Sequence, residues 1–394
     1  MNFKFKIIKK SRKSWARAGV LETPHGRIHT PAFVSVATQG SVKSLAPEDL
    51  KDLGAEIILA NTYHLYLRPG ADVIEKAGGL HKFMNWQGPL MTDSGGFQGF
   101  SFGWGQVHKI GKIGFFPGFD EVRPPREVEP LKPKLVKIAE NGVEFTSHLD
   151  GSKHFFTPEK SIKIQEKLGA DIIFAFDECT SPLAGYDYTK RSLKRTHNWA
   201  VRCLRAAQTQ KSNLKNKKFR QAIFGIIQGG EYKDLREQSA KFISALPFDG
   251  IGIGGSLGKT RKDMFKILKW LHPILPEEKP RHLLGIGKTE DLENCVKLGM
   301  DLFDCVWPTR LARRGTMLIQ KGRINIENSK YAKDFQPIER ECHCYTCRNF
   351  TRAYLSHLFR AKELLAYRLA TIHNLYFTLS LMRKIRENVL NGRI

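Results

Sequence analysis

Several features that mark membrane, secreted or repeat proteins are missing from this chain. It has no run of about 18 apolar residues, the length that a membrane-crossing helix needs. Its basic N-terminus is not followed by the apolar segment and small-residue cleavage site of a secretory signal. No internal repeat, low-complexity tail or cofactor motif is visible. We therefore expect a cytoplasmic protein with no membrane partner.

Acidic residues are scarce relative to basic ones. The chain has 39 Asp and Glu against 64 Lys and Arg, which gives a formal net charge of +25. Such an excess produces a positive field that favours a polyanionic partner such as a nucleic acid. A generally basic proteome or a solubility role gives the same composition, so charge alone does not decide the partner.

Cysteine is also rare, and it is unevenly spread. There are seven cysteines, an odd number, and Cys342, Cys344 and Cys347 are packed closely together. This distribution does not suit a framework of paired disulfides. It indicates a reducing compartment and one metal cluster.

The chain does contain a repeated alternation of short apolar runs with helical patterns. With 394 residues and 41% hydrophobic content it can bury a large core, and continuous apolar runs suit parallel strands buried on both faces. The runs lie at residues 31–37, 56–60, 89–92, 171–176, 222–227, 250–253, 282–286 and 302–306, and helices are predicted at 158–168, 189–208, 232–245, 261–271 and 289–298. Eight such strands predict an α/β fold, a (β/α)8 TIM-like barrel, with a doubly wound open sheet as the competing architecture.

The placement of polar and glycine residues favours the barrel. They stand at or near the ends of the apolar runs, at Asp93, Asp177, Gln228, Gly254, Gly255, Gly285 and Asp304. A barrel directs the carboxyl ends of its strands to one mouth, where active sites are built. The sequence thus predicts one site assembled from several strand ends.

Two stretches interrupt the alternation. Residues 104–134, after the third strand, are rich in Gly, Pro and aromatic residues. They predict a long insert of little regular structure, either a cover over the mouth or a solvated surface loop. After residue 330, a cysteine cluster is followed by an amphipathic helical stretch at about 351–391. We therefore predict a catalytic barrel at 1–330 and a zinc-binding helical subdomain at 331–394.

The cysteine cluster is the most specific pattern that the residues alone provide. The segment CHCYTC at positions 342–347 offers three thiolates, and one later histidine would complete a Cys3His zinc site. His373 lies in a helical stretch beyond Cys347, with His343 and His357 as rivals for the fourth position. Four protein ligands leave no open position for water, so the zinc would be structural.

Two aspartates lie in segments suited to chemistry. Asp93 belongs to TDSGGFQ at 92–98, where glycines let backbone N–H groups approach a ligand. Asp304 belongs to LFDCVWPTR at 302–310, close to arginines that could hold phosphates or read base edges. Either carboxylate could serve as an acid, a base or a nucleophile. The structural alternatives are a helix N-cap at Asp93 and an Asp–Arg pair at Asp304.

Further segments offer groups that a purine can pair with. In FDEC at 176–179, a carboxylate could accept from a purine N–H, and Gln228 with its two glycines suits a carbonyl oxygen. The chain has no cofactor motif, and Asp93 and Asp304 would add two more carboxylates beside a bound nucleoside. This combination favours glycosidic chemistry, in which one carboxylate attacks the anomeric carbon of the sugar and the other gives and takes protons. A covalent intermediate would let an enzyme release one base and accept another.

Together these segments resemble the tRNA-guanine transglycosylase (queuine tRNA-ribosyltransferase) family in its bacterial layout. The matches run in order along nearly the whole chain: NTYHL at 61–65, TDSGGFQ at 92–98, SHLDGS at 147–152, FDEC at 176–179, FGIIQGG at 224–230, FDCVWPTR at 303–310, and CHCYTC with His373. The resemblance implies a homodimeric enzyme of queuosine biosynthesis that exchanges the wobble guanine of GUN-anticodon tRNAs for a 7-deazaguanine base, preQ1 or queuine. It also implies one structural Zn²⁺.

The resemblance also implies roles for individual residues. Asp304 would be the nucleophile and Asp93 the general acid/base. Arg310 and Arg313 would grip the anticodon loop. The base would be bound by Phe97, Asp177, Cys179, Gln228, Gly254, Gly255, Leu284 and Gly285, and the zinc by Cys342, Cys344, Cys347 and His373.

The chain departs from the family pattern in the base-pocket loop. Bacterial relatives usually carry GGLAVGE there, whereas this chain has GGSLGK at 254–259, so Lys259 or Thr260 replaces a glutamate. The incoming base therefore stays open between preQ1 and queuine. The insert and Trp307 are further departures. The alternative functions are a non-catalytic tRNA-binding partner subunit, which has no need of two catalytic carboxylates, and a zinc-dependent hydrolase, which lacks an open zinc position.

Overall fold

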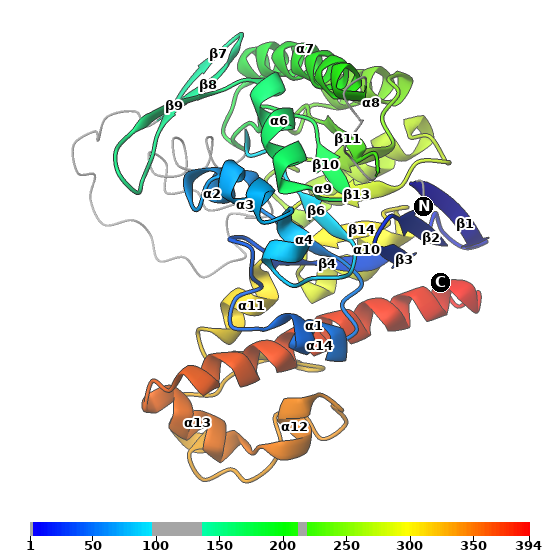
Figure 1. The fold of residues 1–394 in the computed structure, drawn as a ribbon. Coiled ribbons are helices and arrows are strands. Elements are labelled where there is room, and N and C mark those ends of the chain that lie inside the picture. Colours follow the sequence, from blue (N-terminus) through cyan, green and yellow to red (C-terminus); the bar gives the residue numbers. More distant parts are fainter. Residues whose placement is uncertain (1–2, 97–135, 212–218) are drawn as a thin grey trace.

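Eight parallel strands form a closed barrel in the computed structural model, which describes residues 3–96, 136–211 and 219–394 (Figure 1). The strands are β4 (Ala32–Ala37), β5 (Ile58–Ala60), β6 (Leu90–Thr92), β10 (Ile172–Phe174), β11 (Ala222–Ile227), β12 (Gly250–Ile253), β13 (Arg281–Leu283) and β14 (Leu302–Asp304). They pair in the order β10-β11-β12-β13-β14-β4-β5-β6, and β6 pairs with β10 to close the ring. The predicted barrel is confirmed, and the doubly wound open sheet is wrong because these strands leave no open edge.

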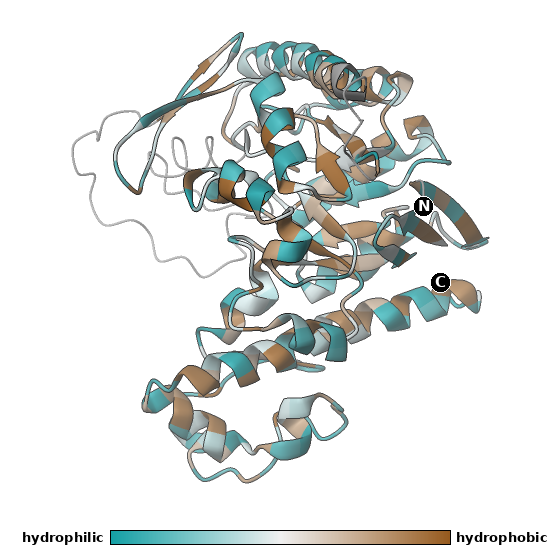
Figure 2. Ribbon diagram, viewed as in Figure 1, coloured by the Kyte–Doolittle hydropathy of each residue, from teal (hydrophilic) through white to brown (hydrophobic). Residues whose placement is uncertain are grey.

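Side chains along the barrel strands alternate between the interior and the surrounding helices. In β11, Phe224 and Ile226 belong to a buried cluster shared with the other strands, whereas Ile223 and Ile227 belong to the larger cluster that includes the helices. This alternation fills the barrel with apolar side chains and buries the outer face of the strands. Figure 2 shows mostly hydrophobic strands at the centre and helices of mixed character around them.

The helices around the barrel begin and end where local sequence requires. The helix α6 (Pro158–Leu168) starts after Thr157, whose hydroxyl accepts the N–H of Lys160, and it ends at Gly169, which has a positive φ of 73°. The helix α9 (Arg261–Leu271) has a reciprocal capping box between Thr260 and Asp263. The other long helices of this layer are α7 (Tyr186–Lys211), α8 (Lys233–Ala245) and α10 (Thr289–Lys297). All five were predicted, although α7 extends beyond 189–208 at both ends.

Shorter helices occupy several of the connections. They are α1 (Pro47–Asp52), α2 (Thr62–Leu67), α3 (Ala71–Lys76), α4 (Leu80–Phe83), α11 (Trp307–Ala312), and the 3₁₀ turns η2 (His272–Ile274) and η3 (Ser329–Tyr331). The helix α2 directly follows β5, and α11 directly follows β14. Both therefore begin at the mouth of the barrel, next to the predicted site.

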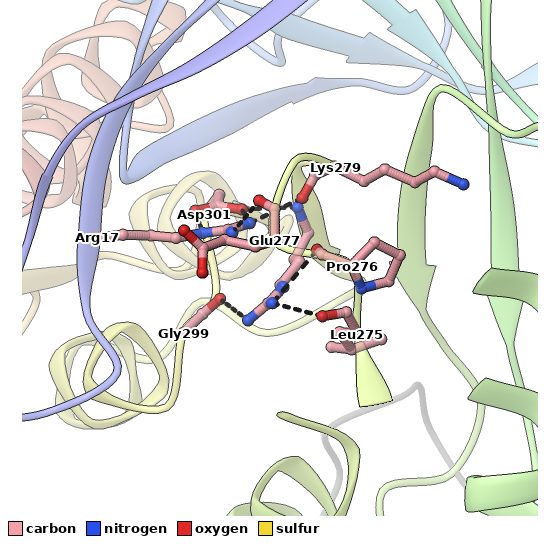
Figure 3. Close-up of polar contacts among 8 residues, drawn as sticks. Arg17, Leu275, Pro276, Glu277, Lys279, Gly299 and Asp301 are labelled. Carbon is pink, nitrogen blue, oxygen red and sulfur yellow. Dashed lines mark hydrogen bonds and ion pairs between the residues drawn. The ribbon is translucent and has the colours of Figure 1, made fainter. Parts of the chain in front are cut away.

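An antiparallel sheet that the sequence patterns did not indicate lies at the amino-terminal end of the barrel. It consists of β1 (Lys4–Lys10), β2 (Arg17–Thr23) and β3 (Gly26–Thr30). Arg17 donates from Nε and Nη2 to the two carboxylate oxygens of Asp301, at 2.9 and 2.6 Å (Figure 3). The backbone N–H of Arg281 donates to the same carboxylate at 2.7 Å. These three side chains are buried, so this ion pair fixes the sheet to β13 and β14.

A second antiparallel sheet comes after the third barrel strand and before α6 in the order of the chain. Its strands are β7 (Val136–Ala139), β8 (Gly142–Thr146) and β9 (Lys153–Phe156). The predicted insert at 104–134 lies outside the described residues.

The C-terminal part contains a two-stranded sheet and three helices. They are β15 (Thr316–Ile319), β16 (Gly322–Asn325), α12 (Tyr345–Asn349), α13 (Arg352–Arg360) and α14 (Leu364–Leu390). The helical stretch predicted at 351–391 is thus divided in two, because Lys362 has a left-handed φ of 57° that a right-handed helix does not contain. Asn374 of α14 accepts from the N–H of Leu318 at 2.9 Å and donates to the carbonyl of Pro308 at 3.1 Å.

The domain boundary at residue 330 stays a prediction. The long helix α14 lies beside the barrel and passes close to α1 and α11 (Figure 1). In the described part of the chain, no helix combines the length and apolar content that crossing a bilayer would require.

Candidate active site

The predicted site residues gather at the carboxyl ends of the barrel strands. Asp93 follows β6, Asp177 lies beyond β10, Gln228 follows β11, Gly254 and Gly255 follow β12, Leu284 and Gly285 follow β13, and Asp304 is the last residue of β14. In a parallel barrel these ends share one mouth. Phe97 lies outside the described residues, so its contact with a base stays a prediction.

Asp93 is held by the start of the neighbouring helix α2. Its Oδ1 accepts the backbone N–H of Thr62 at 2.9 Å and that of Gly95 at 3.1 Å. Its Oδ2 accepts from the side-chain amide of Asn61. Asn61 is itself fixed as the N-cap of α2, where its Oδ1 accepts the N–H of His64 at 3.0 Å. The carboxylate therefore has a defined orientation at the mouth.

The environment of Asp93 favours its protonated form. Burial raises the pKa of Asp93 to about 7, and the nearby charges of Asp304 and Asp177 act in the same direction, against the N–H donors of Thr62 and Gly95. At neutral pH this residue therefore exists in both protonation states. A carboxyl group with such a pKa is suited to giving and taking a proton.

Asp177 and Gln228 form a buried polar pair. Gln228 Nε2 donates to Asp177 Oδ2 at 2.7 Å, and the hydroxyl of Ser94 donates to Asp177 Oδ1 at 3.2 Å. Burial raises the pKa of Asp177 to about 6, although these two hydrogen bonds oppose the shift. Gln228 Oε1 is buried and has no hydrogen-bond partner among the described residues. A buried oxygen of this kind indicates that a ligand donor belongs beside it.

Gly255 lies against this unpaired oxygen. A Cβ at position 255 would stand 1.9 Å from Gln228 Oε1, and the φ of +75° is one that side-chain-bearing residues rarely adopt. The position therefore requires glycine. Gly254 donates its N–H to the carbonyl of Ile227 at 3.1 Å, which ties the loop after β12 to the end of β11.

Asp304 is contacted on one oxygen by two donors. The backbone N–H of Gly285 lies 3.1 Å from Oδ1, and Nε2 of His282 lies 2.9 Å from the same atom. Leu284, the residue before Gly285, donates its N–H to the carbonyl of Ile253 at 3.0 Å. His282 was not among the predicted site residues. It begins an apolar run, and its polar side chain inside that run was the available signal.

A buried arginine, also not predicted, joins the loops around Gln228 and Gly255. Arg236 of α8 is 0% exposed. Its guanidinium donates to four backbone carbonyls, those of Ile227, Gly230, Gly254 and Ser256, at 2.6 to 3.1 Å. Burial lowers the pKa of Arg236 to about 10, so it stays charged at neutral pH. One side chain thus fixes the loop after β11 to the loop after β12.

The remaining predicted residues occupy different surroundings. Cys179 is buried and its Sγ lies 3.9 Å from the carbonyl of Thr180, and burial raises the pKa of its thiol. Its contact with a base stays a prediction. Arg310 and Arg313 lie on and after α11, which starts next to Asp304. In the described part of the chain, neither guanidinium forms an ion pair with a carboxylate, and an Asp304–Arg pair is absent.

Cys342, Cys344, Cys347 and His373 form a cluster that could hold a metal ion. The three sulfurs lie 3.7, 3.6 and 3.3 Å from His373 Nδ1. His373 Nε2 lies 2.7 Å from the carbonyl of Leu318, so it carries the proton and leaves Nδ1 free to act as a ligand. The rival ligands His343 and His357 are both exposed and lie outside the cluster.

Comparison with known proteins gives one consistent result. A family model described as queuine tRNA-ribosyltransferase matches residues 11–116 and 126–394. The queuine tRNA-ribosyltransferase of Caldanaerobacter subterraneus is 50% identical over 99% of this chain and 94% of its own length. That of Thermoanaerobacter pseudethanolicus has the same identity and coverage. A protein of Archaeoglobus fulgidus is 50% identical over 100% of this chain and 97% of its own length.

Proposed function

Because this chain belongs to the queuine tRNA-ribosyltransferase family, we propose that it is a tRNA-guanine transglycosylase that exchanges the wobble guanine of GUN-anticodon tRNAs for a 7-deazaguanine base, preQ1 or queuine. The observation that best supports this proposal is that two carboxylates with different hydrogen-bond partners lie at one barrel mouth. Asp93 has a pKa near neutrality, and Asp304 receives two donors on a single oxygen. The proposed action on tRNA supports a cytoplasmic location as part of the same proposal.

The first half-reaction removes guanine. A carboxylate oxygen of Asp304 attacks C1′ of the ribose, and the C1′–N9 bond breaks with its electron pair leaving on the base. Asp93 supplies a proton to the departing guanine. Asp304 is then joined to the ribose, and the tRNA backbone stays intact.

The second half-reaction uses the same groups in the opposite order. The incoming base gives a ring proton to Asp93, and its nitrogen attacks C1′ as the C1′–O bond to Asp304 breaks. Asp177 and the unpaired Oε1 of Gln228 would bind N–H groups of either base, because guanine and 7-deazaguanine share that edge. Lys259, whose ammonium lies 3.2 Å from Glu231, belongs to the loop after β12 in which this chain departs from the bacterial pattern.

The nucleophile is tested by trapping the covalent adduct between enzyme and tRNA on a denaturing gel. We expect Asp304→Asn to form no adduct, because an amide does not supply the attacking oxygen. Cys305→Ser is the matched control, since Cys305 is the adjacent nucleophilic side chain, and we expect it to keep the adduct. An adduct that survives in Asp304→Asn would disprove the assignment. A wild-type chain that binds tRNA without forming an adduct would favour the tRNA-binding partner subunit instead.

The metal is proposed to be one structural Zn²⁺. Tetrahedral zinc with Zn–S of about 2.3 Å and Zn–N of about 2.0 Å places sulfur and nitrogen about 3.5 Å apart. The observed separations of 3.3 to 3.7 Å fit this spacing. The four ligands would join α12 to α14 and leave no open position for chemistry. We expect a chelator to unfold this part slowly, with activity falling in parallel; an immediate loss of activity in a folded protein would argue for a catalytic metal.

Homodimer formation is a further part of the proposal. Large apolar side chains are exposed in the C-terminal part, with Leu364 82% and Phe335 75% exposed. Exposed groups of this kind suit a protein interface. Light scattering on the purified protein should give twice the 44.9 kDa of one chain.

A further inference from the structure

The side chain that contacts Asp304 from inside the barrel is His282. It lies in β13, is 0% exposed, and places Nε2 at 2.9 Å from Asp304 Oδ1. The parallel pairing of β13 with β14 sets His282 opposite Leu302. Since side chains two residues apart on a strand share a face, Leu302 and Asp304 point the same way, and the His282 ring lies one layer below the carboxylate.

The surroundings of the His282 ring are apolar. The ring of Phe174 meets it edge-on, with centroids 5.5 Å apart and an interplanar angle of 76°. Leu302, opposite it, belongs to the apolar cluster that fills the barrel. A polar ring in such a place destabilises the fold unless it is partnered. The hydrogen bond to Asp304 is therefore the feature that accounts for a histidine here.

The position of the ring proton follows from the contacts. If Nε2 carried no proton, two hydrogen-bond acceptors would lie 2.9 Å apart. Nε2 therefore carries the proton, and its N–H donates a hydrogen bond to Asp304. Nδ1 is buried without a hydrogen-bond partner among the described residues. A proton on Nδ1 would be buried and unpaired, which disfavours the other tautomer.

Both donors act on the same carboxylate oxygen. His282 and Gly285 donate to Oδ1, whereas no donor in the described part of the chain contacts Oδ2. Oδ2 is therefore the oxygen free to attack. In the resulting ester, Oδ1 becomes the carbonyl oxygen and keeps the two donors beside it.

We propose that His282 is a positioning residue that orients Asp304 for attack through Oδ2 and favours its departure in the second half-reaction; this rests on the proposed function. When the incoming base attacks C1′, the C1′–Oδ2 bond breaks and its electron pair returns to the carboxylate. The His282 N–H stabilises that returning charge, and its proton stays on the ring throughout. Hydrogen bonds to a carboxylate are stronger than those to a neutral ester, so the donor favours free Asp304 over the adduct.

The test compares two substitutions of similar size. His282→Met removes the donor, whereas His282→Gln keeps an N–H near the position of Nε2. With saturating tRNA and guanine, we expect His282→Met to raise the ratio of covalent adduct to enzyme without a covalent bond to tRNA by about tenfold. We also expect kcat to fall, while the KM for guanine changes little. We expect His282→Gln to resemble the wild type. If His282 only filled space, His282→Met would lower the amount of adduct and kcat together.

Several results would overturn the inference. They are an unchanged adduct ratio in His282→Met, or an equal effect of both substitutions. If His282→Met does not fold, the inference is tested by the tautomer of the wild-type His282 ring, measured by NMR on protein labelled with ¹⁵N-histidine. A proton on Nδ1 overturns the inference, and a proton on Nε2 supports it. No adduct in the wild type would instead contradict the proposed function.

Discussion

At the scale of single residues, position at the barrel mouth gives the three aspartates different properties. Asp93 and Asp177 both have raised pKa values because they are buried, but Asp177 is bound to Gln228 and Ser94 on both oxygens. Asp304 keeps one oxygen free of protein donors in the described part of the chain. Under the proposed function, these three chemically identical side chains would serve as a proton-transfer group, a binding group and a nucleophile.

The raised pKa of Asp93 predicts a pH dependence for the first half-reaction. In the proposed reaction, the departure of guanine needs protonated Asp93, whose pKa is about 7. The single-turnover rate of adduct formation should therefore fall as pH rises above about 7, by about tenfold per pH unit at the alkaline end. Quenched-flow trapping of the adduct measures this rate. A rate that is flat from pH 6 to 9 would contradict the assignment of Asp93 as the acid.

Stability provides an independent check on Asp93. Its folded-state pKa lies above the ordinary value of 3.8, so the ionised carboxylate destabilises the folded protein, and this penalty fades as pH falls from about 7 toward about 4. Asp93→Asn should therefore raise Tm at pH 8 by about 2–4 °C and raise it less at pH 5. Asp72→Asn is the control and should change Tm in the opposite direction, because the hydrogen bond from Lys167 lowers the pKa of Asp72.

Sequence patterns predicted the aspartates but not their supporting residues. Asp93, Asp177 and Asp304 follow apolar runs in distinctive segments. His282 is one histidine at the start of an apolar run, and Arg236 is one of many basic residues on amphipathic helices. Only the register between β13 and β14, and the packing of α8 against two loops, reveal what these two side chains contact.

At the scale of elements, burial determined which strands the sequence could predict. The eight barrel strands are buried along nearly their whole length and most of their residues are apolar, because both faces are covered. The first strand of the N-terminal sheet is mostly exposed and alternates lysine with apolar residues, so it resembled a basic tail. The helix break at Lys362 was also missed, since no glycine or proline marks it.

Arg236 is expected to control base binding through the two loops that it joins. Arg236→Lys keeps a positive charge but not the planar group that reaches four carbonyls. We expect the KM for guanine to rise by about tenfold and the free energy of unfolding to fall by about 2 kcal/mol. Arg202→Lys, at an exposed pair with Glu159, is the control and should change neither. Lower stability with an unchanged KM would limit Arg236 to a structural role.

The buried ion pair at the other end of the barrel predicts a large effect on stability. Arg17→Met would leave Asp301 ionised and buried, with Arg281 as its remaining donor. Removing one partner of a buried pair costs about 3–5 kcal/mol. Urea unfolding should show this loss, whereas Arg27→Met, at an exposed pair with Glu22, should cost less than about 1 kcal/mol. Equal losses in the two variants would contradict the role given to Arg17.

At the scale of the whole molecule, closure of the barrel and the chain's charge carry the functional argument. The sequence indicated eight strands, but closure depends on the pairing of β14 with β4, the last and the first barrel strands in the chain. Local patterns do not contain that pairing. Once the ring is closed, residues from six strand ends share one mouth, and none of those strands supplies the site alone.

The net charge of +25 predicts how tRNA binding responds to salt. Each phosphate contact adds about 0.7–0.9 to the slope of log K against log salt concentration. We expect a slope of about −3 or steeper for tRNA between about 50 and about 200 mM salt. Binding of free guanine should change little over the same range. A salt-independent affinity for tRNA would show that the basic surface does not dock the substrate.

The most direct test of transglycosylation is the exchange of labelled guanine into unmodified tRNA that carries a wobble guanine. The purified wild-type chain should incorporate label at that single position, preQ1 or queuine should compete, and Asp304→Asn should incorporate none. No incorporation by folded, metal-loaded wild-type protein would contradict the assignment of this chain as a tRNA-guanine transglycosylase.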